Sequence, residues 1–351
     1  MNSRDPLATA KIAAAYVGTI TGAGFASGQE LLQFFAGYGI WGLAGVAAAG
    51  WGFAVLGARV LDLGYHLAAT GYSQILYHVC GRRIGAALDV CSMMFLFGGL
   101  CIMLAGSGAI ARDFLGFPFF AGVAAMALLL LLTTLRGVGG IASANLFIMP
   151  LLILAMLAMG LYSLWYHGVS EFIDELSRIP RPPFSWHWLG SSLQYLSYNL
   201  VFGATMLAPL GRLTPRKEVR HNGAWAGGLL LAALLFWATV LLLTHYGDVS
   251  GSELPVLELS LLQHPWNYRL YAVVLLGAMY TTAAAGLYGT SEKLARRYCL
   301  PLHTAILFVL SLALFFSQFG FSRLIGIIYP AFGLLSCWFT LRLFWLWRRD
   351  N

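Results

Sequence analysis

The sequence predicts an all-α integral membrane protein of ten transmembrane helices, arranged as a five-plus-five inverted repeat with broken first and sixth helices. The composition is the first indication, because 59% of the residues are hydrophobic and only 10% are charged. The second is that the apolar residues gather in segments long enough to cross a bilayer. The third is that glycine-rich interruptions fall in the first and the sixth segment. An ordinary soluble domain is excluded by this balance of apolar and charged residues.

The ten hydrophobic segments follow one another along the whole chain, which we treat as a single transmembrane domain over residues 1–351. They lie at residues 8–36, 39–64, 85–111, 119–136, 139–166, 188–211, 223–245, 268–290, 302–318 and 323–346. The first repeat spans about 8–166 and the second about 188–346. Because five is odd, the second repeat would enter the membrane from the opposite side to the first, which is the pattern of an inverted repeat.

The basic residues support this count. If the N-terminus is cytoplasmic, 16 of the 21 Lys and Arg residues fall on the cytoplasmic side of the predicted topology. Basic residues concentrate in cytoplasmic loops of membrane proteins, so the pattern predicts a multi-pass protein of the cell (inner) plasma membrane with both termini cytoplasmic. The net charge of +7 is explained by these loops, and no nucleic-acid partner is expected.

The first segment contains a glycine-rich stretch over residues 16–35. Gly22, Gly24 and Gly28 each cost about 1 kcal/mol in a helix interior. Ser27 followed by Glu30 has the spacing of a capping box, which occurs where a helix begins. We therefore expect one helix to end near Gly22 and another to begin near Ser27. The alternative is a continuous glycine-rich helix that packs tightly against its neighbours.

The sixth segment carries a second candidate interruption. Gly203 lies in its middle, beside Asn199 and Thr205, and Pro209 weakens the helix further along. Backbone groups released at such breaks cannot be satisfied by lipid, so they must face protein, an aqueous cavity or a ligand. Interruptions at corresponding positions of two repeats are typical of a transport site.

Few polar side chains lie inside the predicted spans. Glu30 is the one carboxylate well inside a span, and it is interpreted either as a proton-coupling group or as the cap of its own helix. Asp62 and Asp89 lie near cytoplasmic helix ends, where arginine partners are expected. Thr281 and Thr282 either ligate a hard cation such as Na⁺ or bond back to their own helix.

Aromatic side chains at helical spacing could line a pocket or simply pack. The candidates are Tyr16, Phe25, Phe97, Tyr198 and Phe202. Two outer connections also have distinct patterns. Residues 167–187 suit a short surface helix followed by a proline-rich turn, and residues 248–266 suit a re-entrant or surface helix over an outward vestibule.

Enzymatic chemistry is not expected. The eight histidines fall in loops or at span ends, and the five cysteines show no CxxC spacing, so neither haem nor zinc is indicated. The sequence contains no Walker loop. No cofactor is therefore expected beyond a coupling ion, Na⁺ or H⁺.

The stretch from Gly22 to Glu30, Gly-Ala-Gly-Phe-Ala-Ser-Gly-Gln-Glu, resembles the YkvI-like membrane proteins, an amino acid permease family of the amino acid–polyamine–organocation superfamily. The resemblance covers nearly the whole chain and implies the LeuT-type fold, with substrate bound at the broken helices. The substrate residues that it implies, together with those taken from the segments themselves, are Gly22, Ala23, Gly24, Phe25, Ala26, Ser27, Tyr198, Asn199, Phe202, Gly203 and Thr205. In sodium-coupled relatives a cation lies between the first and eighth helices, a pattern matched here by Gly18, Thr21, Ala278, Thr281 and Thr282. Those relatives usually lack a carboxylate at the position of Glu30, which keeps H⁺ as an alternative coupling ion.

The functional hypothesis is an ion-coupled secondary active transporter, a Na⁺ or H⁺ symporter of an amino acid or related small zwitterionic solute that works by alternating access. Its expected partners are the small-molecule substrate and the lipid bilayer. The alternative is a membrane sensor with a transporter fold, which binds a small ligand without moving it across the membrane.

Overall fold

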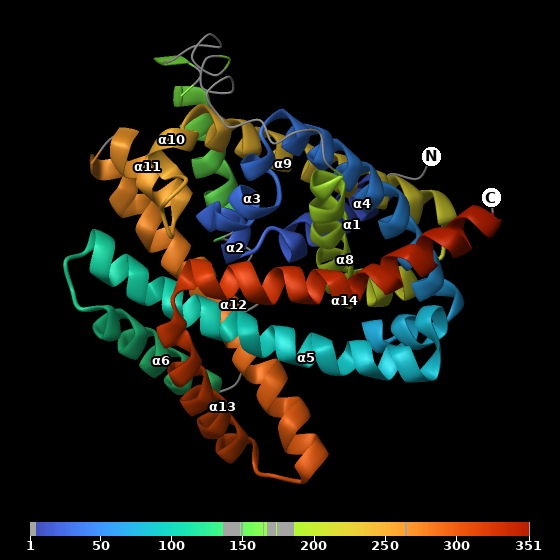
Figure 1. Ribbon diagram of the computed structural model, residues 1–351. Helices are drawn as coiled ribbons and strands as arrows, with labels where there is room; N and C mark the ends of the chain where they lie inside the picture. Colours follow the sequence, from blue (N-terminus) through green and yellow to red (C-terminus); the bar gives the residue numbers. More distant parts are fainter. Residues whose placement is uncertain are drawn as a thin grey trace.

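The computed structural model describes residues 5–135, 148, 150–163, 165–166, 173, 186–263 and 265–350, and within these residues all regular structure is helical (Figure 1). The helices of the first half are α1 (Asp5–Ile20), α2 (Ala23–Ser27), α3 (Gln29–Phe34), η1 (Ala36–Tyr38), α4 (Ile40–His66), α5 (Tyr72–Phe114) and α6 (Phe119–Leu135). Those of the second half are α8 (His187–Leu213), α9 (Lys217–Thr244), α10 (Tyr246–Val249), α11 (Pro255–Gln263), α12 (Pro265–Tyr298), α13 (Leu302–Phe316), η2 (Ser317–Phe319) and α14 (Phe321–Asp350).

The all-α membrane class is confirmed. Among the described residues, six helices are long and apolar enough to cross a membrane, and the shorter helices Phe119–Leu135 and Pro150–Ser163 are also apolar. The fifth predicted span, 139–166, lies partly outside the described residues. For that reason the count of ten stays a prediction. The predicted surface helix and turn at 167–187 lie almost wholly outside the described residues.

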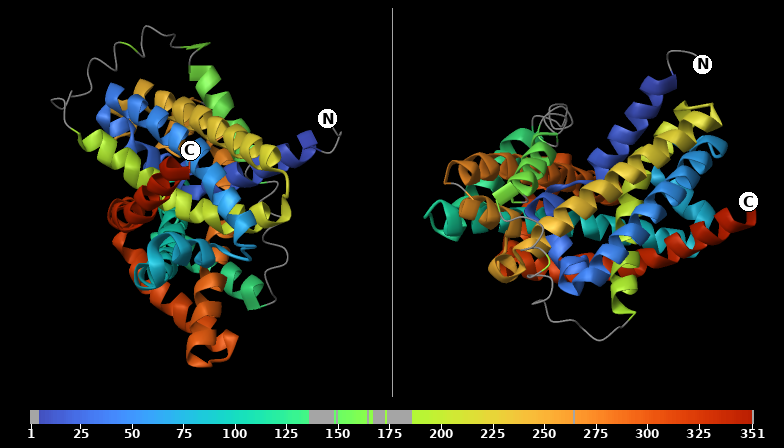
Figure 2. Two further views of the ribbon diagram at one scale, coloured as in Figure 1. Left: turned by 90° about the vertical axis from the view of Figure 1, so that its right-hand side faces the viewer. Right: turned by 90° about the horizontal axis from the view of Figure 1, so that it is seen from above.

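The long helices form two packed sets. α1, α4, α8 and α9 pack against one another, and α5, α6, α12 and α13 form the second set. Each set takes helices from both halves of the chain. α14 lies alongside α5, as Figure 1 shows, and also packs on α8, so it joins the two sets. The start of α1 and the end of α14 lie toward the same side of the molecule (Figures 1 and 2).

The predicted break in the first helix is confirmed, but its position differs from the prediction. α1 ends at Ile20 and α2 already begins at Ala23, with Gly22 in an extended conformation before it. Gly28 then separates α2 from α3 in a left-handed conformation, φ +82° and ψ −11°, which favours glycine. The helix after the break thus has a bend of its own.

The predicted capping box is wrong. The Ser27 hydroxyl donates to the Gly24 carbonyl (2.7 Å) and accepts from the N–H of Gln29 (3.2 Å), while no side chain caps α3. The Glu30 side chain turns away to α8, where Tyr198 Oη donates to Glu30 Oε2 at 2.8 Å. Glu30 thus bonds to Tyr198 on another helix, and not locally at Ser27 as the spacing predicted.

The predicted break in the sixth helix is also wrong. α8 is one helix from His187 to Leu213, and it includes Pro209. Gly203 serves close packing, because a Cβ at that position would lie 2.9 Å from Cε2 of Tyr16. A glycine in a membrane helix can thus mark a close contact as well as an interruption.

The amphipathic piece predicted at 248–266 forms α10 and α11. α11 packs against α2 and α12. A Cβ at Gly28 would lie 2.6 Å from Cγ2 of Val256 and 3.3 Å from its backbone nitrogen. α11 therefore covers the bend between α2 and α3.

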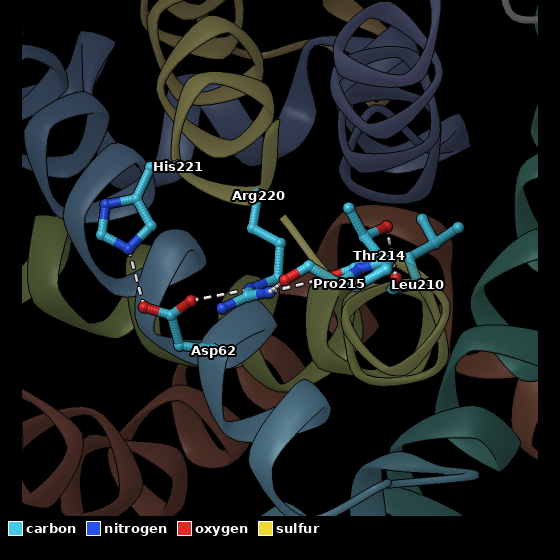
Figure 3. Close-up of polar contacts among 6 residues, drawn as sticks. All are labelled: Asp62, Leu210, Thr214, Pro215, Arg220 and His221. Atoms are coloured by element: carbon cyan, nitrogen blue, oxygen red, sulfur yellow. Dashed lines mark hydrogen bonds and ion pairs between the residues drawn. The ribbon is translucent and has the colours of Figure 1, made fainter. Parts of the chain in front are cut away.

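Two ion-pair clusters join helices at the ends predicted to be cytoplasmic. In the first, Asp62 of α4 accepts from Arg220 Nε (2.8 Å), and its other oxygen lies 2.7 Å from His221 Nε2 (Figure 3). Arg220, 2% exposed, also donates to the carbonyls of Thr214 and Pro215, so the α8–α9 connection is fastened to α4. The predicted arginine partner of Asp62 is thereby confirmed.

The second cluster joins α5 to α12. Asp89 accepts from Lys293 Nζ (3.0 Å), Tyr72 Oη (2.8 Å) and Ser73 Oγ (3.0 Å). Its basic partner is therefore a lysine, where an arginine was predicted. Tyr72 and Asp89 lie on either side of Gly81, whose φ of +75° bends α5.

Candidate functional site

A small cavity of about 90 Å³ lies beside the break, between the two helix sets. Its walls come from seven helices (α1, α2, α3, α5, α8, α12 and α14) and from Gly22 of the break itself. The lining residues are Thr19, Ile20, Gly22, Ala23, Gly24, Glu30, Phe95, Leu96, Gly99, Tyr198, Asn199, Phe202, Thr282, Gly286 and Tyr329. This set includes eight of the residues that the sequence singled out.

The break supplies main-chain polar groups to this cavity. The N–H of Gly22 bonds to the carbonyl of Ile20, and Ala26 N–H bonds to the Gly22 carbonyl. Within the described residues, the N–H groups of Ala23 and Gly24 and the carbonyl of Thr19 have no main-chain partner. Since lipid cannot satisfy such groups, they are suited to hold a solute or water.

Glu30 supplies the one carboxylate among the lining residues, and its side chain lies over Gly24. A Cβ built on Gly24 would overlap Glu30 Oε1, so only glycine leaves room for the carboxyl group there. Glu30 is 5% exposed, and both Tyr198 and Tyr329 hydrogen-bond to it. A buried carboxyl group held in this way lines the cavity, and it does not cap a helix.

Four aromatic rings form one wall of the cavity: Phe95, Tyr198, Phe202 and Tyr329. The Phe95 ring centroid lies 5.8 Å from that of Tyr198, 4.9 Å from Phe202 and 5.0 Å from Tyr329. Tyr198 and Tyr329 are themselves 5.2 Å apart. We call these four side chains the ring wall.

Several predicted substrate residues lie elsewhere. Phe25 and Ala26 contact a separate crevice against Leu152 and Met156. Ser27 is fully buried in the α2–α3 bend. Gly203 faces Tyr16, and Tyr16 itself donates to the Phe53 carbonyl (3.0 Å), so this tyrosine is a packing residue.

Thr205 and Phe97 also lie outside the cavity. Thr205 is exposed, and its hydroxyl donates to the carbonyl of Phe202 at 2.6 Å. Phe97 lines a groove between α5 and α14 together with Phe316.

Of the five predicted cation ligands, one lines the cavity. Thr282 lines the cavity, whereas the buried Thr281 donates to the carbonyl of Ala278 (3.0 Å). Thr21 donates to the carbonyl of Val17 (2.8 Å), and Gly18 is half-buried near the end of α1. Thr281 thus makes the local bond that was the alternative to cation binding for the Thr281 and Thr282 hydroxyls.

Sequence reasoning missed seven lining residues: Thr19, Ile20, Phe95, Leu96, Gly99, Gly286 and Tyr329. Most of them come from α5, α12 and α14, whose segments contain no interruption. The adjacent glycines 98 and 99 were the one local signal, since small residues allow close approach. Their orientation toward the cavity depends on how α5 packs.

A second, larger cavity of about 750 Å³ opens on the side where α10 and α11 lie, lined by Gln33, Phe34, Tyr38, His187 and Gln194 among others. Phe34 separates it from the ring wall, its ring centroid lying 5.7 Å from that of Tyr198. Ser191 Oγ donates to the Phe34 carbonyl (2.9 Å), which fastens α3 to α8 there. Tyr271 Oη donates to the Ala26 carbonyl (2.6 Å), which fastens α2 to α12.

Two solved structures share this arrangement of helices. The inward-facing conformation of Mhp1 covers 93% of this chain and 73% of its own, with a TM-score of 0.58 at 14% identity. The manganese transporter of Eremococcus coleocola, in complex with an aromatic bis-isothiourea substituted compound, covers 94% and 76%, with a TM-score of 0.58 at 15% identity. Fold and cavity therefore define a membrane protein with the LeuT-type transporter fold.

Within that class, the chain belongs to the YkvI family of membrane proteins. It is 31% identical over 331 residues to the "Uncharacterized membrane protein YkvI" of Bacillus subtilis (strain 168), across 93% of this chain and 92% of that protein. It is 28% identical over 324 residues to the "Uncharacterized protein YyaD" of the same organism, across 91% of each. No protein-family model matches the chain.

Proposed function

We propose that the chain is an ion-coupled secondary active transporter of an amino acid or a related small zwitterionic solute. The observation that carries the proposal is the break between Ile20 and Ala23, whose unpaired main-chain groups border the small cavity. Unwound backbone near the membrane midplane is the usual means by which transporters of this architecture hold solutes and ions. The fold shared with Mhp1 and the manganese transporter supports the same reading.

Alternating access would come from movement of one helix set against the other. The cavity lies where the two sets meet, and α14 contacts both. On the side of the larger cavity, the Ser191 and Tyr271 hydrogen bonds would have to open to admit solute. If both termini lie in the cytoplasm, as predicted, the larger cavity would open on the outer side of the plasma membrane.

The coupling ion in this proposal is Na⁺ or H⁺. Na⁺ would use the Thr282 hydroxyl with main-chain carbonyls near the end of α1, and H⁺ would use the Glu30 carboxyl group. Thr282→Val removes a hydroxyl with little change in shape. The matched control is Thr133→Val on α6, whose hydroxyl bonds only within its own helix. Sodium coupling predicts that Thr282→Val raises the Na⁺ concentration needed for uptake, with no effect of the control.

Purified protein in proteoliposomes provides the test of transport. We expect labelled amino acid to exchange across the membrane, and net uptake to follow either a Na⁺ gradient or a pH gradient. Binding that saturates, with no exchange under any gradient, would contradict transport and favour the membrane sensor instead.

A further inference from the structure

The polar character of the cavity is one-sided. Among the described lining residues, Glu30 is the single ionisable side chain apart from the two tyrosines, and none is Lys, Arg or His. Among these residues, a solute carboxylate would therefore find only uncharged donors, such as main-chain N–H groups, the Asn199 amide and the Thr282 hydroxyl. A solute cation would find a carboxylate that is 95% buried, since Glu30 is 5% exposed.

The ring wall adds a second feature that favours a cation. An ammonium group is attracted to the face of an aromatic ring when it lies within about 6 Å of the ring centroid. Phe95, Tyr198 and Tyr329 are packed within 5.8 Å of one another and border the same small cavity as the Glu30 carboxyl group. A cation in this space would meet rings and carboxylate together.

The same composition disfavours a metal ion as the solute. Hard metal ions take about six oxygen ligands. Near Glu30 the cavity is bordered by the rings of Phe95, Tyr198 and Tyr329, and the faces of these rings supply no oxygen ligand. Among the described residues, no group of three or more His, Cys, Asp and Glu side chains is placed to hold a metal. An organic ammonium group needs fewer oxygens and benefits from the rings.

We propose that Glu30 and the ring wall form an ammonium-binding subsite, and that the substrates are small organic amines for which a carboxylate is dispensable. The claim about substrates rests on the proposed transport function, because it names the chemical class of the solute that would be transported. Tyr198 and Tyr329 hold the carboxyl group over Gly24, and the solute ammonium lies between that carboxyl group and the rings. The main-chain groups at the break then accommodate the rest of the solute.

Three closely related solutes, which differ in the groups they carry, test the subsite in binding assays on the purified full chain. Alanine carries both an amine and a carboxylate, ethylamine lacks the carboxylate, and propionate lacks the amine. Alanine and ethylamine should both raise the unfolding temperature in a dose-dependent manner, because a ligand that binds only the native state stabilises it. Propionate should leave the temperature unchanged.

Variants locate the effect. Glu30→Gln keeps the size of the side chain and a hydrogen-bond acceptor for Tyr198, and should weaken ethylamine binding about 10- to 100-fold. Phe95→Leu keeps an apolar wall but removes a ring, and should weaken it about threefold to tenfold. The control Glu292→Gln changes a carboxylate that pairs with Arg296 at the end of α12, outside the cavity, and should bind as the unaltered chain does.

The outcomes separate this proposal from the transport function. Equal stabilisation by propionate and ethylamine, no stabilisation by either amine, or unaltered binding in Glu30→Gln would each overturn the ammonium subsite. Exchange of labelled propionate across proteoliposomes would also overturn it, while leaving transport intact. If both amines bind and depend on Glu30, but labelled alanine and ethylamine do not exchange, the subsite stands and the transport function fails.

Discussion

The hydroxyl group of Tyr198 donates a 2.8 Å hydrogen bond to Glu30 Oε2, which links α8 to α3 across 168 positions of sequence. Both side chains are buried, and both line the cavity beside the helix break. The bond joins the helix that follows the break to the first helix of the second half. The orientation of the only carboxylate on the cavity wall thus depends on a partner far away in the sequence.

Tyr198→Phe tests the contribution of that bond. The variant keeps the ring and removes the donor from a buried carboxyl group, so we expect a loss of about 1–3 kcal/mol of stability. Thermal unfolding in detergent measures it. Tyr298→Phe is the control, since Tyr298 is 66% exposed at the end of α12, and it should change little. Equal unfolding temperatures for Tyr198→Phe and the unaltered chain would contradict the role given to the bond.

Gly24 is expected to tolerate no side chain. A Cβ there would overlap Glu30 Oε1, so Gly24→Leu should abolish ligand binding while the protein remains folded and inserted in the membrane. Gly24→Ala should already displace the carboxyl group. A matched control is Gly289→Ala on α12, where the new Cβ would make an ordinary contact of 3.5 Å with Leu96. Ligand-induced thermal shifts provide the measurement, and retained uptake in Gly24→Leu would place the solute elsewhere.

Gly28 combines an unusual conformation with a close contact. Its φ of +82° costs a non-glycine residue about 1–2 kcal/mol, and a new Cβ would also meet Val256. Gly28→Ala should therefore lower stability by more than the conformational cost alone. Adding Val256→Ala should recover the steric part and leave the conformational part, as judged from unfolding temperatures. No recovery in the double variant would show that α11 does not press on this bend.

The buried ion pair of Asp62 and Arg220 should respond asymmetrically to substitution. Asp62→Ala leaves a guanidinium that is 3% exposed without its carboxylate, which costs about 3–5 kcal/mol. The double variant Asp62→Leu with Arg220→Met should regain most of that loss, because apolar residues of similar size replace both charges.

The exposed pair of Arg296 and Glu292 is the natural comparison. Its arginine side chain is 80% exposed, so Glu292→Ala should have almost no effect on the unfolding temperature. A large loss in Asp62→Ala together with a small loss in Glu292→Ala confirms that burial decides the contribution. Similar losses in both would contradict it.

The sequence by itself determined the membrane class, the approximate spans and the break in the first helix. These features follow from composition, segment length and glycine content, which act locally and can be read along the chain. Local patterns also misled in two places. Gly203 marks a close approach to Tyr16 inside a continuous α8, and Ser27 and Glu30 do not cap one another.

Only the tertiary structure decided which residues line the cavity. Phe95, Gly286 and Tyr329 come from helices in which the sequence analysis indicated no break, and they meet Glu30 because α5, α12 and α14 pack around the break. A helix presents side chains in every direction, and the direction that becomes a binding surface is set by its neighbours. Packing between helices distant in sequence therefore placed one buried carboxylate on the wall of a cavity, and no spacing along the chain could indicate that placement.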